Sequence, residues 1–273
     1  MRAVVLSGFD HPVTLRDIPV PEVPPGHVRV RMIAAGLNRI DVNIAIGAMK
    51  GMVDYDFPVV LGRAGAGVVD ALGDGVTTLA VGDEVVGHVL LSGVPLRDGT
   101  LGEYAILPID GVAPKPSDLD FVDAAALPLA GSAALAIMDA IEPLPDDVVL
   151  VVGASGGVGS YVVQLVAARG ATAIATGLPE DADRLRELGA ARVVDYRQPL
   201  HRQVTERVDT LVDLVNYAPD GLAANATLVR DGGMITSSLG AADDDTLSAR
   251  DIKGVNVMAA PQTYTLTRLV EEV

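Results

Sequence analysis

The sequence predicts an α/β protein in which a small, mostly antiparallel β domain precedes a doubly wound parallel-sheet domain. Three observations support this fold class. Short β-branched runs separated by Gly and Pro fill the first part of the chain. The stretch VVLVVGASGGVGSYVVQLVAA, residues 148–168, places four glycines inside an apolar run. The composition is 49% hydrophobic but only 3% aromatic, which suits a core of Val, Leu, Ala and Ile beneath helices.

The first domain is expected over residues 1–117. Its candidate strands are short apolar runs bounded by turn residues: HVRVRMIAAGLN, GAGVVDALGDGV, GDEVVGHVLL and GTLGEYAILP. The nearly uncharged segment DAAALPLAGSAALAIMDAI follows and is expected to be helical, with breaks at Pro128 and Gly131. We expect this segment to pack between the two domains and to lead into the first strand of the second domain, which is expected over residues 118–259.

The stretch 148–168 is as long as a membrane-spanning helix and carries no charge. A continuous helix is disfavoured, because each glycine costs about 1 kcal/mol relative to alanine. The better division is a buried strand at Val148–Val152, a glycine turn, and a helix that ends at Gly170. The following segments read as strand, helix and three strands: ATAIAT, DADRLRELGA, ARVVDY, VDTLVDLV and GGMITSSLG. This order predicts a Rossmann-type dinucleotide-binding domain.

A glycine turn at a helix start lets the backbone approach a pyrophosphate, which the free N–H groups then face. We expect this contact from Gly153, Ser155, Gly156, Gly157, Val158 and Gly159. The second strand ends in Thr176-Gly177-Leu178, without the acid that binds an adenosine ribose, and this favours NADP over NAD. Candidate 2′-phosphate donors are Arg184, Tyr196 and Arg197, although each alone also fits a solvated surface position. Asn216 and Leu239-Gly240 follow strands four and five, where the nicotinamide ribose is expected to pass.

Composition and charge exclude several classes of protein. The net charge of −16 argues against nucleic-acid binding and against anionic membrane surfaces. The absence of Cys excludes disulfides, thiolate nucleophiles and Cys–zinc sites. The start of the chain, MRAVVLSGFDHP, lacks the apolar stretch of a secretory leader, so a cytoplasmic protein is expected.

Several motifs, in order, resemble the medium-chain dehydrogenase/reductase superfamily, and most closely its zinc-independent quinone oxidoreductase and enoyl reductase branch. They are AAGLNRID, FPVVLGRAGAGVVDALGDGVTTLAVGDEVVG, LGEYAILP, AAALPLAG and VLVVGASGGVGSYVVQLVAARGA. The resemblance implies a GroES-like catalytic domain, a Rossmann domain, NADPH in the cleft between them, and a homodimer. It also implies that residues 260–273 return toward the first domain, where the chain looks cut short.

The resemblance also predicts that no metal takes part. Zinc-dependent relatives carry Cys at the position of Asn38 and a His-Glu pair at Arg63-Ala64. The four His residues of this chain are scattered and lack ligand spacing. The chain also departs from the branch that it resembles at four positions. That branch often has an acidic residue at Ala64 and an aromatic residue at Asn43. It often has a Thr at Ala133 and a basic residue at Asp181. The last change weakens the expectation of NADP.

The expected activity is hydride transfer from NADPH to a quinone or an α,β-unsaturated carbonyl. The cofactor carries the chemistry, and the protein supplies orientation and electrostatics. By family position, the candidate catalytic residues are Asn38, Asp41, Tyr55 and Ser132. Asp41 is equally consistent with a structural role, and Tyr55 lies in a loop of variable length. Alternatives are an enoyl-thioester reductase of a biosynthetic pathway and an NADPH-binding protein without turnover.

Overall fold

The computed structural model describes residues 1–89, 95–242, 247, 250–258 and 263–272. The chain folds into two compact units, called unit 1 (Met1–Ser132 with Ala260–Val273) and unit 2 (Ala133–Ala259). Two expectations reach outside the described residues: the strand expected in GDEVVGHVLL at residues 90–91, and the returning segment at residues 260–262 and 273.

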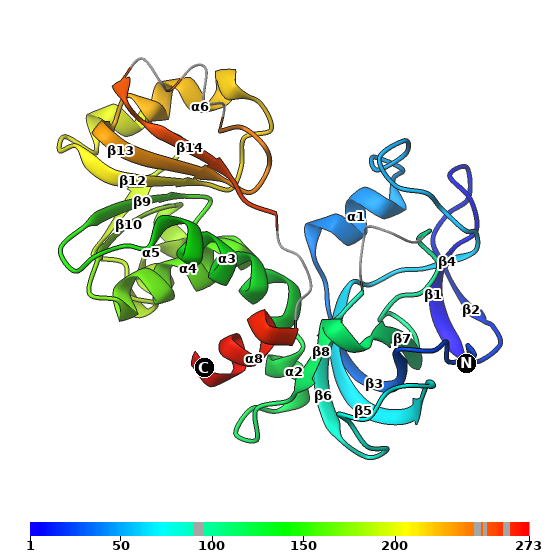
Figure 1. Cartoon of the computed structure of the whole chain (residues 1–273). Helices are drawn as coiled ribbons and strands as arrows, with labels where there is room; N and C mark the ends of the chain where they lie inside the picture. The colour runs from blue at the N-terminus through cyan, green and yellow to red at the C-terminus, as the bar shows by residue number, and fades with distance from the viewer. Residues whose placement is uncertain (90–94, 243–246, 248–249, 259–262, 273) are drawn as a thin grey trace. The chain divides into compact units, whose positions relative to one another are not determined.

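Unit 1 contains two antiparallel sheets (Figure 1). The five-stranded sheet has the order β7-β3-β5-β6-β8. Its strands are β3 (His27–Gly36), β5 (Ala64–Leu72), β6 (Glu84–His88), β7 (Tyr104–Pro108) and β8 (Val112–Pro114). The three-stranded sheet has the order β2-β1-β4, from Arg2–Leu6 (β1), Thr14–Asp17 (β2) and Val59–Val60 (β4). Alternating apolar residues of these strands form the unit's core, which confirms the predicted antiparallel β domain.

Helical segments cover parts of these sheets. They are α1 (Arg39–Ala45), a 3-10 turn (Ile109–Gly111), α2 (Phe121–Ala124), a π turn (Leu127–Gly131) and α8 (Thr263–Glu272). Leu266 of α8 is fully buried and packs with Ala124 and Ala125, while Leu269 lies against Gly131. Residues 118–132, which we expected in the second domain, therefore pack within unit 1, together with the last helix.

Unit 2 is built on a six-stranded parallel sheet with the order β11-β10-β9-β12-β13-β14. Its strands are β9 (Val148–Val152), β10 (Thr172–Gly177), β11 (Arg192–Asp195), β12 (Val208–Asp213), β13 (Val229–Ser237) and β14 (Lys253–Asn256). The chain runs outward from β9 in one direction and then restarts at β12 on the other side. This reversal is the topological switch point of a doubly wound fold.

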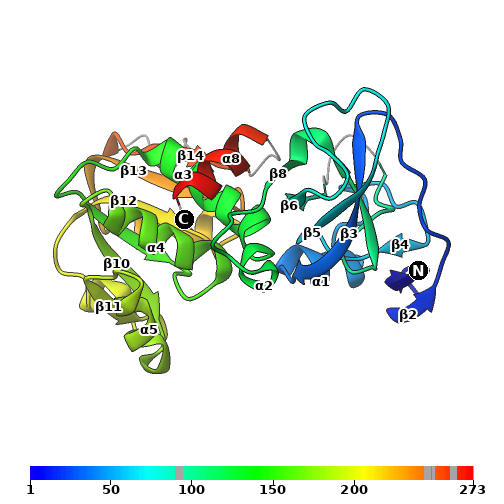
Figure 2. The same ribbon diagram turned by 90° about the horizontal axis from the view of Figure 1, so that it is seen from below.

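Both faces of this sheet are covered, because successive side chains of a strand point to opposite faces. Val149 and Val151 of β9 pack with three helices, namely α3 (Ser132–Ile141), α4 (Gly157–Ala168) and α5 (Ala182–Glu187). Leu150 and Val152 pack on the other face with α6 (Pro219–Ala226). Figure 2 shows α4 lying across the parallel strands. Two short 3-10 turns, Pro179–Asp181 and Leu200–Arg202, also belong to this unit.

The stretch 148–168 is therefore strand, turn and helix, as predicted. The helix α4 ends just before Gly170, whose φ of 78° is the left-handed conformation expected of a helix-terminating glycine. The parallel sheet confirms the Rossmann-type domain and adds β14 and α6, which the sequence patterns did not indicate. Among the described residues, no helix combines the length and the apolar character that crossing a membrane requires.

Candidate functional site

The glycine turn between β9 and α4 is shaped by two glycines that accept no side chain. Gly153 has a φ of 90°, and a Cβ there would lie 2.9 Å from Val215 Cγ1. A Cβ at Gly159 would collide with the carbonyl oxygen of Gly153 and lie 2.6 Å from Ala154 Cα. Because both neighbours are backbone, the first turn of α4 packs against the end of β9 only with glycine at this position.

The surface of this turn is open where a ligand is expected. Gly156 and Gly157 are exposed, and Ser155 and Val158 are half-buried. The first N–H groups of a helix have no partner within the helix, and they attract anions. Two exposed glycines beside these N–H groups let a pyrophosphate approach the backbone closely. The turn therefore fits the pyrophosphate of a dinucleotide, and the six residues predicted for it lie in the loop after β9 and in the first turn of α4.

The end of β10 contributes to the same turn. Thr176 is 1% exposed, and its hydroxyl accepts a hydrogen bond of 2.9 Å from the Gly153 N–H. The buried Thr176 hydroxyl thus fixes the backbone of the glycine turn and is not exposed to a ligand. Gly177 is buried, and the Leu178 N–H donates to the Asp181 carboxylate at 3.2 Å. The acid that replaces the family's basic residue is therefore used to close the turn after β10.

Arg184 of α5 reaches the glycine turn. Its Nη2 donates to the Ser155 carbonyl oxygen at 2.9 Å, and its Nη1 donates to Ser160 Oγ at 3.2 Å. Both acceptors are neutral, and Arg184 forms no ion pair with any described residue. Its charge is therefore available to a phosphate at the turn.

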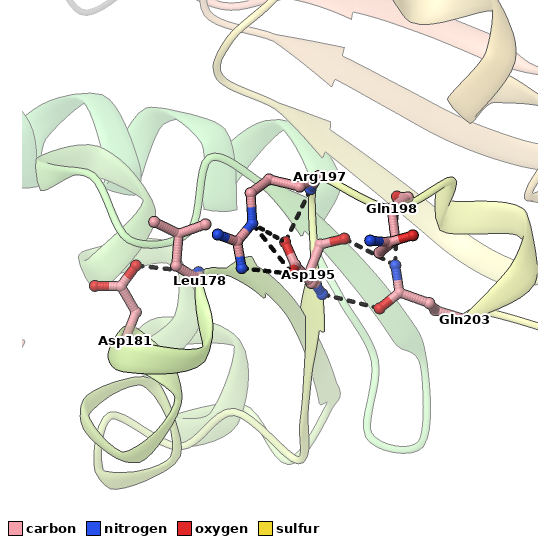
Figure 3. Close-up of polar contacts among 6 residues, drawn as sticks. All are labelled: Leu178, Asp181, Asp195, Arg197, Gln198 and Gln203. Atoms are coloured by element: carbon pink, nitrogen blue, oxygen red, sulfur yellow. Dashed lines mark hydrogen bonds and ion pairs between the residues drawn. The ribbon is translucent and has the colours of Figure 1, made fainter.

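Tyr196 and Arg197 follow Asp195, the last residue of β11, which is paired with Gly177 at the end of β10. Figure 3 shows Arg197 beside Asp195. Tyr196 is 51% exposed. The Arg197 guanidinium is paired with the carboxylate of Asp195, with Nη2 to Oδ2 at 2.9 Å and Nε to Oδ1 at 3.1 Å. Of the two candidate arginines, Arg184 is thus free of carboxylates and Arg197 is paired with one.

Two buried acceptors shape the loops that follow β12 and β13. Asp213 is 0% exposed, and its carboxylate accepts from the N–H groups of Val215 and Asn216 and from Asn216 Nδ2. Ser237 is also 0% exposed, and its hydroxyl accepts from the N–H groups of Leu239 and Ala241 at 3.1 Å. The predicted residues Asn216, Leu239 and Gly240 therefore lie in loops that these two side chains hold in place.

In unit 1, Asn38 precedes the first turn of α1, and Asp41 lies within that turn. The Asp41 carboxylate accepts a 2.7 Å hydrogen bond from the Asn38 N–H, while Asn38 Nδ2 donates to the Gly36 carbonyl oxygen. Asp41 is 3% exposed, and its Oδ1 has no hydrogen-bond partner among the described residues. Burial raises the pKa of the Asp41 carboxyl, and the Asn38 N–H and the Arg63 guanidinium oppose that rise.

Arg63 is a fully buried cation near Asp41. Its Nη2 donates to the carbonyl oxygens of Val60 at 2.9 Å and Asp98 at 2.6 Å. Its Nε and Nη1 have no acceptor among the described residues. Burial lowers the pKa of Arg63 to about 10, against the opposing attraction of Asp41 and Asp98. The Arg63 cation and the Asp41 carboxylate thus attract each other while both are buried, where screening by solvent is weak.

The other two candidate catalytic residues differ in their surroundings. The Tyr55 hydroxyl is 3.4 Å from the Ile44 carbonyl oxygen, and its ring packs against Phe9 and Phe57. Ser132 is 1% exposed, and its hydroxyl has no partner among the described residues. Tyr55 is therefore engaged within unit 1, whereas the Ser132 hydroxyl retains its full hydrogen-bonding capacity.

Within the described part of the chain, no three His, Asp or Glu side chains come together in an arrangement that holds a metal ion. His88, the buried histidine, lies on β6 opposite Ala64, and its Nε2 is unpaired in the described structure.

Several residues of these sites were not singled out from the sequence. Asp213 and Ser237 carried a usable signal, since each is a polar residue at the carboxyl end of a predicted buried strand. Asp195 carried the same signal at the end of the third strand. No sequence signal indicated the burial of Arg63 and His88, because it depends on pairing between strands that are far apart in the sequence.

Fold and site together define a GroES-like unit joined to a Rossmann dinucleotide-binding unit. The alcohol dehydrogenase GroES-like domain family matches residues 24–117. Over 249 residues the chain is 32% identical to the NADPH-dependent alkenal/one oxidoreductase, chloroplastic, of Arabidopsis thaliana, covering 88% of this chain and 63% of that protein. The chain belongs to the medium-chain dehydrogenase/reductase superfamily.

Solved structures agree with this assignment. The quinone oxidoreductase from Coxiella burnetii has a TM-score of 0.88 and 27% identity, covering 99% of this chain and 86% of that one. A structure described as an NAD-dependent alcohol dehydrogenase has a TM-score of 0.84 and 32% identity, covering 100% of this chain and 89% of that one. The chain spans about 60% of the length of the first curated relatives it matches.

Proposed function

We propose that this protein is an NADPH-dependent oxidoreductase that reduces a quinone or an α,β-unsaturated carbonyl. The observation that carries the proposal is the glycine turn of unit 2, where Gly159 leaves no room for a Cβ and exposed glycines line the helix start. The names of two similar proteins, an alkenal/one oxidoreductase and a quinone oxidoreductase, support the substrate class. When bound, the reduced nicotinamide supplies the hydride.

The choice of NADPH rests on the end of β10 and on Arg184. No acidic side chain stands at Thr176-Gly177-Leu178, where an acid would bind the ribose hydroxyls of NADH. Arg184 offers a cation beside the glycine turn, and the name of the plant relative includes NADPH. Two observations weigh against a strong preference for NADPH over NADH. One similar structure is described as an NAD-dependent alcohol dehydrogenase, and the acids Asp181 and Asp195 lie near the end of β10.

The residues proposed for the reaction lie in unit 1. Asn38 and Ser132 offer a polar amide and an unpaired hydroxyl for the substrate or the nicotinamide. Asp41 holds the Asn38 backbone in place, and the buried Arg63 cation favours negative charge developing on a substrate oxygen. The proposal is completed by a reaction without zinc and by a cytoplasmic homodimer, which the family resemblance and the absence of Cys support.

The test is a turnover panel with the purified chain. NADPH oxidation is followed with a benzoquinone and with a short-chain alkenal as acceptors, and alcohol oxidation with NADP and NAD serves as the comparison. Acceptor-dependent oxidation of NADPH is expected with at least one of the first two. Turnover of alcohols alone would overturn the proposed substrate class.

A variant tests the part played by the glycine turn. Gly159→Ala is expected to abolish NADPH binding, followed by nicotinamide fluorescence, because the new Cβ collides with the Gly153 carbonyl oxygen. Gly8→Ala is the matched control, since Gly8 lies in unit 1 and its new Cβ would meet only the ring of His11, an exposed side chain that can move. Equal binding by the Gly159→Ala protein would contradict the placement of the cofactor at this turn.

A further inference from the structure

The ends of β10 and β11 lie side by side in unit 2. In the parallel register, Gly177 is opposite Asp195 and Thr176 is opposite Val194. The group at the 2′ position of an adenosine ribose lies at the end of the second strand of a dinucleotide fold, which here is β10. The turn of residues 195–197 is therefore a direct neighbour of that position.

Figure 3 shows the Arg197 side chain folded back over Asp195, with its guanidinium directed toward Leu178 at the end of β10. Asp195 binds it through both carboxylate oxygens, with Nε contacts of 3.1 and 3.2 Å and an Nη2 contact of 2.9 Å. The pairing raises the pKa of Arg197, with a smaller contribution from Glu180, and lowers the pKa of Asp195. Arg197, which follows the residue paired with the end of β10, thus already has a carboxylate partner.

The turn that holds this pair is fixed by its backbone. Gln203 Oε1 accepts from the Asp195 N–H at 2.9 Å, and Gln203 Nε2 donates to the Asp195 carbonyl oxygen at 2.8 Å. The Asp195 carboxylate also accepts the Arg197 N–H at 2.9 Å. Asp195 and Arg197 are therefore held next to each other by contacts within the chain itself.

A phosphate that approaches Arg197 meets the negative charge of Asp195 at the same place. The phosphate must either displace the carboxylate or share the guanidinium with it, and both options weaken the attraction. A ribose hydroxyl is neutral and meets no such repulsion. Arg184 differs from Arg197 in this respect, since its contacts are with a carbonyl and a hydroxyl oxygen.

We propose that Asp195 is a specificity-determining residue, which limits the preference for a 2′-phosphorylated cofactor by neutralising Arg197. The proposal rests on the function proposed above and deepens it. It predicts that the protein as it stands discriminates only weakly between NADPH and NADH. Removal of the charge at residue 195 strengthens the discrimination in favour of NADPH.

The experiment compares Asp195→Asn with the unchanged protein. Asparagine keeps an oxygen that accepts the Arg197 N–H, and the two Gln203 contacts involve only the backbone of residue 195. Binding of 2′,5′-ADP and of 5′-ADP is measured by titration calorimetry, and NADPH and NADH by nicotinamide fluorescence. We expect Asp195→Asn to bind 2′,5′-ADP about fivefold more tightly, as for an exposed ion pair, with 5′-ADP unchanged.

A second substitution separates the charge from the shape of the turn. Arg197→Gln is expected to remove the gain when combined with Asp195→Asn, and to change 2′,5′-ADP binding little when introduced alone. The matched control is Glu206→Gln, which breaks the Arg192–Glu206 pair of 2.6 Å at the other end of β11. We expect this control to leave all four affinities unchanged.

Three results would overturn the proposal. One is unchanged or weaker 2′,5′-ADP binding by Asp195→Asn. Another is weaker 5′-ADP binding by the same variant, because Asp195 would then be a ligand of the ribose. The third is an absence of nucleotide binding by both proteins. Normal binding of 2′,5′-ADP without any hydride transfer would count against the proposed function alone, since neither ADP carries a nicotinamide.

Discussion

Three buried polar side chains at strand ends of unit 2 and two buried side chains of unit 1 differ in how their polar atoms are hydrogen-bonded. In unit 2, Thr176, Asp213 and Ser237 lie at strand ends, and each accepts hydrogen bonds from backbone N–H groups of a neighbouring loop. In unit 1, Arg63 and His88 are just as deeply buried, but nitrogen atoms of both have no acceptor among the described residues. Similar burial therefore has opposite consequences.

The difference shows which kind of substitution or pH change is expected to affect each unit. A buried acceptor that is satisfied by backbone N–H groups fixes the shape of a loop, so the loops of unit 2 are formed in advance of any ligand. A buried group with unused hydrogen-bonding capacity carries a desolvation cost, so the stability of unit 1 depends on the ionisation of a few side chains.

The largest expected effect comes from Arg63→Ala. The substitution leaves a cavity, removes hydrogen bonds to the carbonyl oxygens of Val60 and Asp98, and takes a cation away from Asp41. We expect the free energy of unfolding to fall by about 3–5 kcal/mol. Urea denaturation measures this loss, with Arg97→Ala as the control, because Arg97 is 70% exposed in its pair with Asp56. Losses of equal size would contradict the contrast between buried and exposed arginines.

The next effect is a dependence of stability on pH. Burial lowers the pKa of His88 from 6.5 to about 4, so the folded protein binds this proton less tightly than the unfolded chain. Neutral His88 therefore contributes about 3 kcal/mol to the free energy of unfolding above pH 6.5, and this contribution is lost as the pH falls toward 4. Urea denaturation at several pH values is expected to show a shallower acid loss for His88→Gln.

The matched control for this pH effect is His201→Gln. His201 is exposed on the surface of unit 2, so the variant should follow the pH dependence of the unchanged protein. Parallel curves for all three proteins would show that His88 ionises freely in the folded state.

In unit 2, Asp213→Asn removes one of the acceptors that shape a loop. The N–H groups of Val215 and Asn216 both donate to Oδ1, which the asparagine oxygen replaces. The new amide nitrogen takes the place of Oδ2 and faces Asn216 Nδ2, so that donor loses its acceptor. We expect a loss of about 1–3 kcal/mol in the free energy of unfolding, measured by urea denaturation. Asp231→Asn is the control, since the Asp231 side chain is 80% exposed in its pair with Arg250. If the Asp213→Asn protein were as stable as this control, the buried carboxylate of Asp213 would not be what fixes the loop after β12.

The smallest expected effect is that of Tyr55→Phe. The hydroxyl is 3.4 Å from the Ile44 carbonyl oxygen, at the long limit of a hydrogen bond, and the ring keeps its contacts with Phe9 and Phe57. The free energy of unfolding should change by less than about 1 kcal/mol. Thermal and urea unfolding measure it, and a loss comparable to that of Arg63→Ala would show that the hydroxyl supports the buried charges of unit 1.

The architecture of unit 2 was accessible from the sequence because its signals are local. The β-branched run before Gly153, the glycine turn and the amphipathic helix each lie within a few residues, and they repeat along the chain. The edge strand β14 was missed because Lys253–Asn256 shows no apolar alternation. An edge strand has only one partner, and its composition is correspondingly less constrained.

The site was accessible only in part. The glycine turn was predicted residue by residue, since its geometry permits few alternatives to glycine. The state of Arg197 was not predicted, because a charge pattern does not show which cation is paired and which is free. The burial of Arg63 depends on the Asp98 carbonyl oxygen, which is 35 positions away and is brought near by the fold.

The hydrogen bond from the Gly153 N–H to Thr176 has a consequence for protein engineering. Changes of cofactor preference are usually sought at the end of the second strand of such a fold. In this protein that strand end also supports the glycine turn proposed to hold the pyrophosphate, so a library that varies residue 176 is expected to change both proposed subsites at once. Libraries restricted to Leu178, Asp195 and Arg197 are expected to change the proposed ribose subsite and to leave the glycine turn intact.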